Sequence, residues 1–496
     1  MKLNLKKRSI VGINLNNESR KLVSFYKPGK KINTDYTVLE HIFPILKSKN
    51  KFGTKKRLEY GKKKTQIRAY FNNIDTCRSN PRMKQKDTML KILKKFGKQH
   101  KDILNKIYME FKFSNSMRIK IDKFVTDEIY KLSFDRCVEW LNLNGIELLR
   151  AIYIFYLDRK LPTDMVELLG YYPHVRGEFT SLDIQNEIDI GLKKSKKVKI
   201  ERDGILLDLT IFSNKNINLS NQFLERCFYM DLLLKSANLN KRNKINLEVW
   251  LSNKKKDLPP PRKVKYIGPK EVNSGCNTFS SEGNKVSVWR KEEFPKVLVH
   301  ELVHSLGLEK HSDYGEVKEF IYKYFDVGRN NNLNVFECYV ELMAEIINII
   351  LLDRGRGRFN KLINIELEHC LFQVGKILNY FGYSRWDEFY KNEGWVEGSK
   401  TGKYQQRSNV FSYFIFRSMV MYNMDDFIKL CLTKNKRHFL KQDFESKELL
   451  NIVRKTLLDK DFERTINRYI KLNKQNYKSD DIVYRNLRMT CVEGQL

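Results

Sequence analysis

The sequence predicts an α+β protein, in which a basic, mainly helical N-terminal region comes first, then a sheet, and then a long helical part. Short segments of alternating apolar residues lie between residues 195 and 290, and this period is typical of strands. Beyond residue 310 the apolar residues recur almost entirely at helical spacing. A chain of 496 residues exceeds what one hydrophobic core usually supports, so two or three domains are expected.

The first 190 residues are expected to form two regions. Residues 1–90 combine Lys, Asn, Gly and short apolar runs without a sustained period, so they are predicted to be a basic region of uncertain order. Residues 91–190 are predicted to form a helical domain, because apolar residues recur at helical spacing in segments such as RCVEWLNLNGIELLRAIYIFYLDR.

Basic side chains are concentrated near the N-terminus. Residues 1–100 contain 27 Lys and Arg against 6 Asp and Glu, a net charge of +21 out of +34 for the whole chain. Such a segment attracts nucleic acid or another anionic partner, because neutralising phosphates releases counterions. The alternative is that lysine only fills ordinary surface positions in a Lys- and Asn-rich chain.

The cysteines and the apolar runs indicate the compartment. The eight cysteines are scattered, without a CxxC pair, which favours a reducing compartment over a secreted disulfide scaffold. The N-terminal MKLNLKKRSIVGINLNNESR lacks the apolar core of a signal peptide, and no run of 18 or more apolar residues occurs. We therefore expect a soluble intracellular protein without a transmembrane segment.

Four strands are predicted ahead of the long helical part. The first two form a hairpin over residues 196–212, because a central Asp-Gly pair is flanked by alternating apolar residues. A helix is predicted over 219–237 and a third strand over 245–252. The fourth strand is predicted over 284–290, where NKVSVWR alternates.

A helix is predicted directly after the fourth strand. Pro295 stands at its start, where a missing N–H costs nothing, and Gly307 is suited to cap its end. A second long helix is predicted over residues 336–353, FECYVELMAEIINIILLD. The first of these helices contains the most informative motif of the chain.

The motif His300-Glu301-Leu302-Val303-His304 has the spacing of a zinc site. Four residues make about one helical turn, so both imidazoles project from one face toward one ion. Glu301 would accept a proton from zinc-bound water, whose pKa the ion lowers. The alternative is a buried helix whose two histidines only make hydrogen bonds inside the core, which is costly for such an ionisable cluster.

A catalytic zinc ion usually has three protein ligands, so a third is sought elsewhere. HELVHSLGLEKH nearly matches HExxHxxGxxH, but the last histidine falls one residue late, at His311. Glu337 lies 33 residues after His304, and Glu341 follows one helical turn later. Glu337 would bind the metal, while Glu341 would accept the second ring N–H of a ligating histidine. The alternative is that Glu337, Glu341 and Glu345 form the solvated stripe of an amphipathic helix.

HExxH followed on a later helix by ExxxE resembles the gluzincin group of zinc metallopeptidases. Residues 195–425 are also similar to metallopeptidases encoded by large DNA viruses, through VNSGCNTFSSEGNKVSVWRKEEFPKVLVHELVHSLGLEK, NVFECYVELMAEI and SNVFSYFIFRS. The resemblance implies a zincin-like catalytic domain over residues 191–430, with a twisted mixed sheet, an active-site helix and a helical lower half. A C-terminal helical extension over 431–496 would follow it. A viral origin is also implied, with the host cytoplasm or the virion as the location.

The resemblance also implies roles for single residues. It supports His300, His304 and Glu337 as zinc ligands and Glu301 as the general base. Its downstream aromatic run matches at Tyr413, a candidate donor to the oxyanion formed at the attacked carbonyl. The rival candidates, for each of which core packing is the alternative, are Tyr404, Tyr339 and His369.

The strand at 284–290 directly precedes the active-site helix. If it forms the edge of the sheet, as the resemblance favours, an extended substrate would pair with it as a further strand. The alternative is an ordinary core strand. The exopeptidase motif GxMEN is missing upstream of His300, so an aminopeptidase activity has no support in the sequence.

The function that the sequence predicts is a zinc-dependent peptidase acting on protein or peptide substrates. The competing hypothesis is a viral nucleic-acid- or core-binding structural protein with a vestigial or structural metal site. An intact Glu301 favours the peptidase, because a structural site has no need for a base and usually closes its fourth position with a protein ligand.

Overall fold

The computed structural model describes most of the chain from residue 245 onward. The stretches described there are 245–258, 266–278, 284–311, 314–331, 333–353, 357–396, 398–436, 438–477 and 479–494. Before residue 245 it describes residues 78–79 and part of 13–32 and of 184–237. The helical domain predicted over 91–190 therefore lies outside the described residues, apart from two positions near its end.

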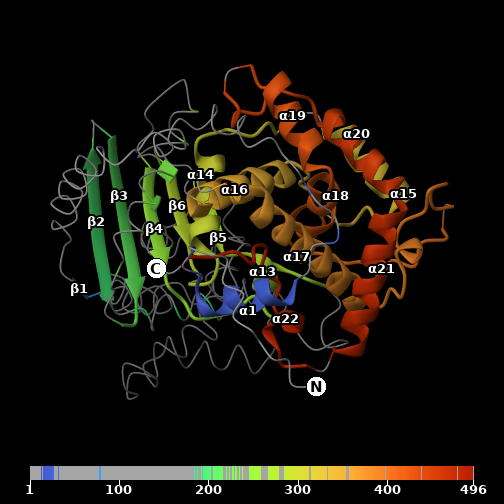
Figure 1. Ribbon diagram of the computed structural model, residues 1–496, viewed down its shortest axis with the longest axis horizontal. Helices are drawn as coiled ribbons and strands as arrows, with labels where there is room; N and C mark the ends of the chain where they lie inside the picture. The colour runs from blue at the N-terminus through green and yellow to red at the C-terminus, as the bar shows by residue number, and fades with distance from the viewer. Residues whose placement is uncertain are drawn as a thin grey trace, which may run out of the picture.

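A mixed sheet forms one side of the molecule (Figure 1). Its strands are β1 (Arg78–Ser79), β2 (Lys194–Arg202), β3 (Ile205–Ser213), β4 (Ile245–Trp250), β5 (Gly275–Thr278) and β6 (Asn284–Val288), in the order β1-β2-β3-β4-β6-β5. Strands β3, β4 and β6 are parallel to one another, whereas β1, β2 and β5 pair antiparallel with their neighbours. The predicted hairpin is confirmed, since β2 and β3 pair antiparallel and Arg202 pairs with Ile205.

The edge of the sheet next to the helix that contains His300 and His304 differs from the expectation. Strand β6 is an inner strand between β4 and β5, so the prediction that residues 284–290 form the edge is wrong. The outer strand is β5, which pairs antiparallel with β6. Its four residues are too few to show an alternating pattern in the sequence.

The helices fill the other side of the molecule (Figure 1). They are α13 (Pro269–Val272), α14 (Phe294–Ser305), α15 (Gly315–Tyr324), α16 (Glu337–Asp353), α17 (Phe359–Tyr380), α18 (Arg417–Tyr422), α19 (Met424–Lys434), α20 (Ser446–Leu457), α21 (Lys460–Gln475) and α22 (Ile482–Arg485). The described residues also form a 3-10 turn, η5 (Trp386–Glu388), a π-helix, η6 (Phe411–Phe416), and, near the N-terminus, α1 (Asn17–Phe25). The two predicted helices at 295–306 and 336–353 correspond to α14 and α16.

Helix α14 lies between the sheet and the helical side, where it contacts β5 and β6 on one side and α16 on the other. Pro295 is in its first turn, as predicted. Gly307 follows its end with φ of +59°, and the amide of Leu308 donates to the carbonyl of Val303. This left-handed backbone conformation ends the helix, and glycine is the residue that adopts it without strain.

One apolar core runs through both sides and includes the N-terminal residues that the structure describes. Leu15 forms a β-bridge with Gly494, and the amide of Ile32 donates to the side chain of Asn364 over 2.6 Å. Leu22 and Tyr26 are buried in this core. The described residues between 13 and 32 therefore pack with residues much later in the chain, rather than standing apart from them.

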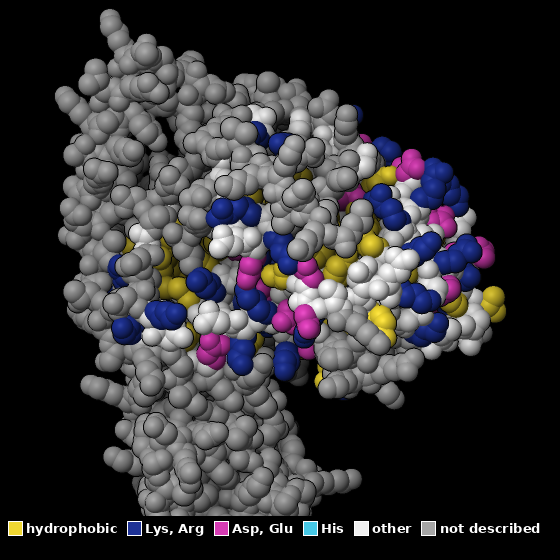
Figure 2. Space-filling model, turned by 60° about the horizontal axis from the view of Figure 1, so that its bottom comes forward, with side chains coloured by type: hydrophobic (Ala, Val, Ile, Leu, Met, Phe, Trp, Pro, Cys, Tyr) yellow, Lys and Arg dark blue, Asp and Glu magenta, His cyan; other side chains and the backbone are white. Residues whose placement is uncertain are grey.

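The hydropathy of the helices and the distribution of charge on the face in Figure 2 are two further properties of the described residues. Among the helices that the structure describes, none combines the length and the hydropathy that crossing a bilayer requires. Figure 2 shows one face on which Lys and Arg side chains are interspersed with Asp and Glu. On this face the described residues form no patch of a single sign of charge.

Candidate metal centre

Three side chains from α14 and α16 converge on one point. Nε2 of His300 and Nε2 of His304 are 3.2 Å apart, because four residues place them on the same face of α14. Oε2 of Glu337, the first residue of α16, lies 3.3 Å from each of these nitrogens. All three residues are largely buried, and they are the group in the described part of the chain that could hold a metal ion.

The three separations fit a tetrahedral zinc ion. Ligand nitrogens at about 2.0–2.1 Å from zinc, with tetrahedral angles, are about 3.3 Å from one another. The three donors would therefore occupy one face of the tetrahedron and leave the fourth vertex free. Three lone-pair donors this close repel one another unless a cation lies between them, so a metal ion fits the donor set.

The other ring nitrogen of each histidine faces a carboxylate. Nδ1 of His304 and Oε1 of Glu309 are 2.7 Å apart, at hydrogen-bonding distance. Nδ1 of His300 lies 2.8 Å from Oε1 of Glu341, although the ring N–H is not aimed at this oxygen. These contacts favour a proton on each Nδ1. The lone pair of each Nε2 is then available to bind a metal ion.

Glu301 lies between α14 and the outer strand of the sheet. A Cβ atom at Gly275 of β5 would be 2.5 Å from Oε1 of Glu301, so only glycine leaves room for this carboxylate. Burial raises the pKa of Glu301 to about 7, although His300 and His304 lower it. Burial also opposes charge on Glu337, but the two histidines hold the pKa of its carboxyl at about 2. A base is most effective when its pKa is near the operating pH, which suits Glu301 to that role.

Tyr413 lies beside the three donors, in the π-helix η6. Its ring centroid is 6.0 Å from that of His300, and the side chain is mostly buried. Asn409 donates from its amide to Oε1 of Glu337 over 3.0 Å and to the hydroxyl oxygen of Tyr413 over 3.5 Å. The tyrosine hydroxyl therefore accepts from Asn409, and its own proton has no acceptor among the described residues. π-Helical turns are frequent at functional sites.

The rival candidates lie in other networks. Tyr404 donates its hydroxyl proton to Gln406, the hydroxyl of Tyr339 accepts from Asn435, and His369 contacts the hydroxyl of Tyr26. His311 is also outside the group of three donors. Its Nε2 lies 3.0 Å from Oε1 of Glu309, and 63% of its side chain is exposed.

The glutamates of α16 do not form a solvated stripe. Glu337, Glu341 and Glu345 are 8%, 2% and 0% exposed. A carboxylate this deeply buried needs a charge partner, and each of the three has one. The alternative of a surface stripe is therefore wrong.

Glu309, Asn409 and Gly275 were not predicted from the sequence. A signal for Glu309 was present, because the left-handed residue Gly307 ends the helix two positions earlier and the acid that follows it contacts His304 in the last turn. Asn409 and Gly275 reach the site only through packing of elements far apart in the sequence.

Comparison with known proteins adds no family to this geometry, because no family model, no curated protein and no solved structure matches the chain. Any function proposed for it therefore rests on the metal centre and its surroundings.

Proposed function

We propose that this chain is a zinc-dependent metallopeptidase of the gluzincin type, with a zincin-like fold around the centre formed by α14 and α16. The observation that carries the proposal is the set of three nearly equal separations, 3.2 to 3.3 Å, among Nε2 of His300, Nε2 of His304 and Oε2 of Glu337. A buried acid, Glu301, follows the first of these donors on the same helix.

The side chains around the centre have the chemistry that peptide hydrolysis needs. When bound, zinc supplies a Lewis acid that polarises the scissile carbonyl and lowers the pKa of water. Glu301 accepts a proton from the attacking water as the water oxygen bonds to the carbonyl carbon. When the C–N bond breaks, Glu301 gives that proton to the leaving nitrogen, and its own side chain becomes a carboxylate again. Tyr413, whose hydroxyl proton is free, donates to the developing oxyanion.

The outer strand β5 is the place where we propose that the substrate lies. It is short, it stands at the end of the strand order, and Gly275 within it contacts Glu301. An extended peptide that pairs with β5 through main-chain hydrogen bonds would run beside the general base. The β-augmentation predicted for residues 284–290 is thus proposed for residues 275–278 instead.

The proposal is tested with a mixed peptide library and mass spectrometry of the products. The purified full-length chain is expected to contain about one zinc ion and to cleave internal peptide bonds. A chelator should stop cleavage, and added Zn²⁺ should restore it. If the zinc-loaded protein cleaves no peptide or unfolded protein at neutral pH, the peptidase assignment is wrong.

The charge of residues 1–100 favours a second property, binding of nucleic acid or another anionic partner. We propose that the eight Lys and Arg of residues 51–68 contribute to it. Changing these eight residues to Gln is preferable to deletion of residues 1–90, because Leu22 and Tyr26 belong to the core. The variant is expected to bind single- and double-stranded DNA more weakly, with a smaller salt dependence, while its zinc content stays the same. Equal binding and salt dependence in the two proteins would rule out this role.

A further inference from the structure

A second layer of charged side chains lies one helical turn behind the metal centre. Three elements repeat the same offset of four residues: Lys296 precedes His300 on α14, Glu341 follows Glu337 on α16, and Arg417 follows Tyr413 where η6 continues into α18. Side chains four residues apart lie on the same face of a helix, one above the other. The elements that present the front layer therefore also bring these three side chains together.

The three side chains meet at the carboxylate of Glu341. Nζ of Lys296 is in direct contact with Oε2 of Glu341, and Nη1 of Arg417 lies 3.3 Å from the same oxygen. Oε1, the remaining oxygen, is the one that lies 2.8 Å from Nδ1 of His300. Both cations thus bind one oxygen of the carboxylate, and the other oxygen faces the histidine.

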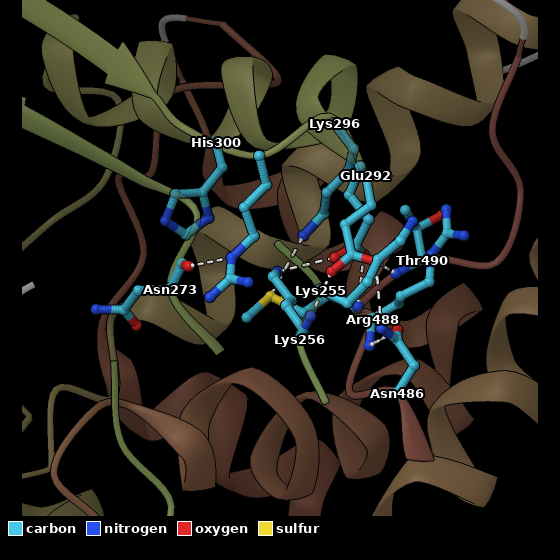
Figure 3. A network of polar contacts seen from close by, with 12 residues as sticks. Lys255, Lys256, Asn273, Glu292, Lys296, His300, Asn486, Arg488 and Thr490 are labelled. Carbon is cyan, nitrogen blue, oxygen red and sulfur yellow. Dashed lines mark hydrogen bonds and ion pairs between the residues drawn. The ribbon is translucent and has the colours of Figure 1, made fainter. Parts of the chain in front are cut away.

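The C-terminal segment, residues 486–494, holds the two cations from the other side. Nη2 of Arg417 donates to the carbonyl of Met489 over 2.8 Å, and Nζ of Lys296 lies 3.9 Å from its sulfur. The amide of Met489 in turn donates to Oε1 of Glu293 over 2.5 Å. Figure 3 shows Lys296 and His300 projecting from one helix, with residues of the C-terminal segment beside Lys296.

The side chains of this layer are almost fully buried. Glu345 lies 3.7 Å from Nη1 of Arg417, and Lys296, Glu341, Glu345 and Arg417 are each at most 2% exposed as residues. Breaking a buried ion pair by removing one partner leaves an uncompensated charge. Loss of either cation would therefore remove one of the two charged contacts that hold Oε2 of Glu341.

We propose that Lys296 and Arg417 are positioning residues for the metal centre, which fix the carboxylate of Glu341 so that its free oxygen faces Nδ1 of His300. The inference rests on the metal centre of the proposed function, but not on peptide cleavage. Neither cation touches a ligand atom, so their effect passes through Glu341. Outer partners of a ligating histidine typically change metal affinity by about 10- to 100-fold.

The test compares Lys296→Met with Lys376→Met in the full-length protein. Lys376 of α17 is a matched control, because it is also buried and donates to the carbonyl of Asn486 in the same C-terminal segment. Zinc affinity is measured by competition with a chelator, the metal environment by the visible spectrum of the Co²⁺-loaded protein, and stability by thermal unfolding. Lys296→Met is expected to bind zinc about 10- to 100-fold more weakly and to alter the Co²⁺ spectrum. Lys376→Met should keep both properties, even if its melting temperature falls.

A double variant shows whether Lys296 acts through Glu341. If it does, Lys296→Met/Glu341→Gln should bind zinc no more weakly than Glu341→Gln alone, because residues acting through one contact are not additive. Additive losses, or an equal loss of affinity in Lys376→Met, would overturn the inference. If Lys296→Met does not fold, Arg417→Lys takes its place. Lysine keeps the charge of Arg417 but cannot contact Glu341 and Met489 at the same time. A normal zinc affinity of Arg417→Lys would also overturn the inference.

The two proposals fail in different ways. A wild-type protein that binds zinc and cleaves nothing refutes the peptidase but leaves the positioning measurable as affinity. A wild-type protein without affinity for zinc or Co²⁺ refutes the metal centre and this inference with it.

Discussion

Glu301→Gln is expected to lower kcat/KM for peptide cleavage by at least about 10²-fold while the protein keeps its fold and its zinc. Glutamine has nearly the same shape as glutamate but cannot accept the proton of the attacking water. Glu301 is also outside the group of three donors that could hold the ion, so its replacement leaves them in place. The measurement is kcat/KM on a peptide that the wild type cleaves, together with zinc content and melting temperature.

Gly275→Ala gives this experiment a matched companion. The new Cβ would lie 2.5 Å from Oε1 of Glu301, so the carboxylate is moved rather than removed. A misplacement of about 1 Å can cost about 10²-fold in rate. Gly275→Ala is therefore expected to be impaired but more active than Glu301→Gln, with full zinc content. If Glu301→Gln retains wild-type activity, Glu301 is not the general base.

Glu337→Ala is expected to remove most of the zinc affinity, by more than about 100-fold, and with it all activity. The variant lacks one of the three donors, whereas the usual effect of losing an outer partner is about 10- to 100-fold. Titration of the metal-free protein with zinc, in competition with a chelator of known affinity, measures the difference.

His311→Ala is the control for this prediction. His311 is mostly exposed and contacts Glu309 rather than the three donors, so its loss should change zinc affinity little. If His311→Ala releases the zinc and Glu337→Ala retains it, the centre is of a three-histidine type, and the gluzincin assignment is wrong.

Local spacing explains what could be predicted of this centre. His300 and His304 share a face because they are four residues apart, and the same spacing placed Glu341 behind Glu337. Both helices were predictable from apolar periodicity, and the ends of α14 also from Pro295 and Gly307. None of these predictions required knowledge of how the elements pack.

The parts that were missed depend on packing between distant residues. Lys296 is 45 residues from Glu341 in the sequence, and Arg417 is 76 residues from it. A single buried Lys or Arg produces no recognisable sequence pattern. The outer strand β5 has only four residues, so its pairing decides its structure more than its composition does. Likewise, the periodicity of residues 1–90 gives no sign that Leu22 and Tyr26 belong to the core.

The buried position of the C-terminal segment has a consequence for the order of folding. The three donors are all synthesised by residue 337, but Met489, which holds Lys296 and Arg417, leaves the ribosome about 8 to 30 s later at about 5–20 residues per second. Pairing of Asn16 with Glu493 closes a loop of nearly the whole chain, and contacts of such sequence separation form slowly. A nascent chain can therefore present both histidines and Glu337 before the charged layer behind them exists. Full metal affinity is then acquired only after the C-terminal segment has entered the core.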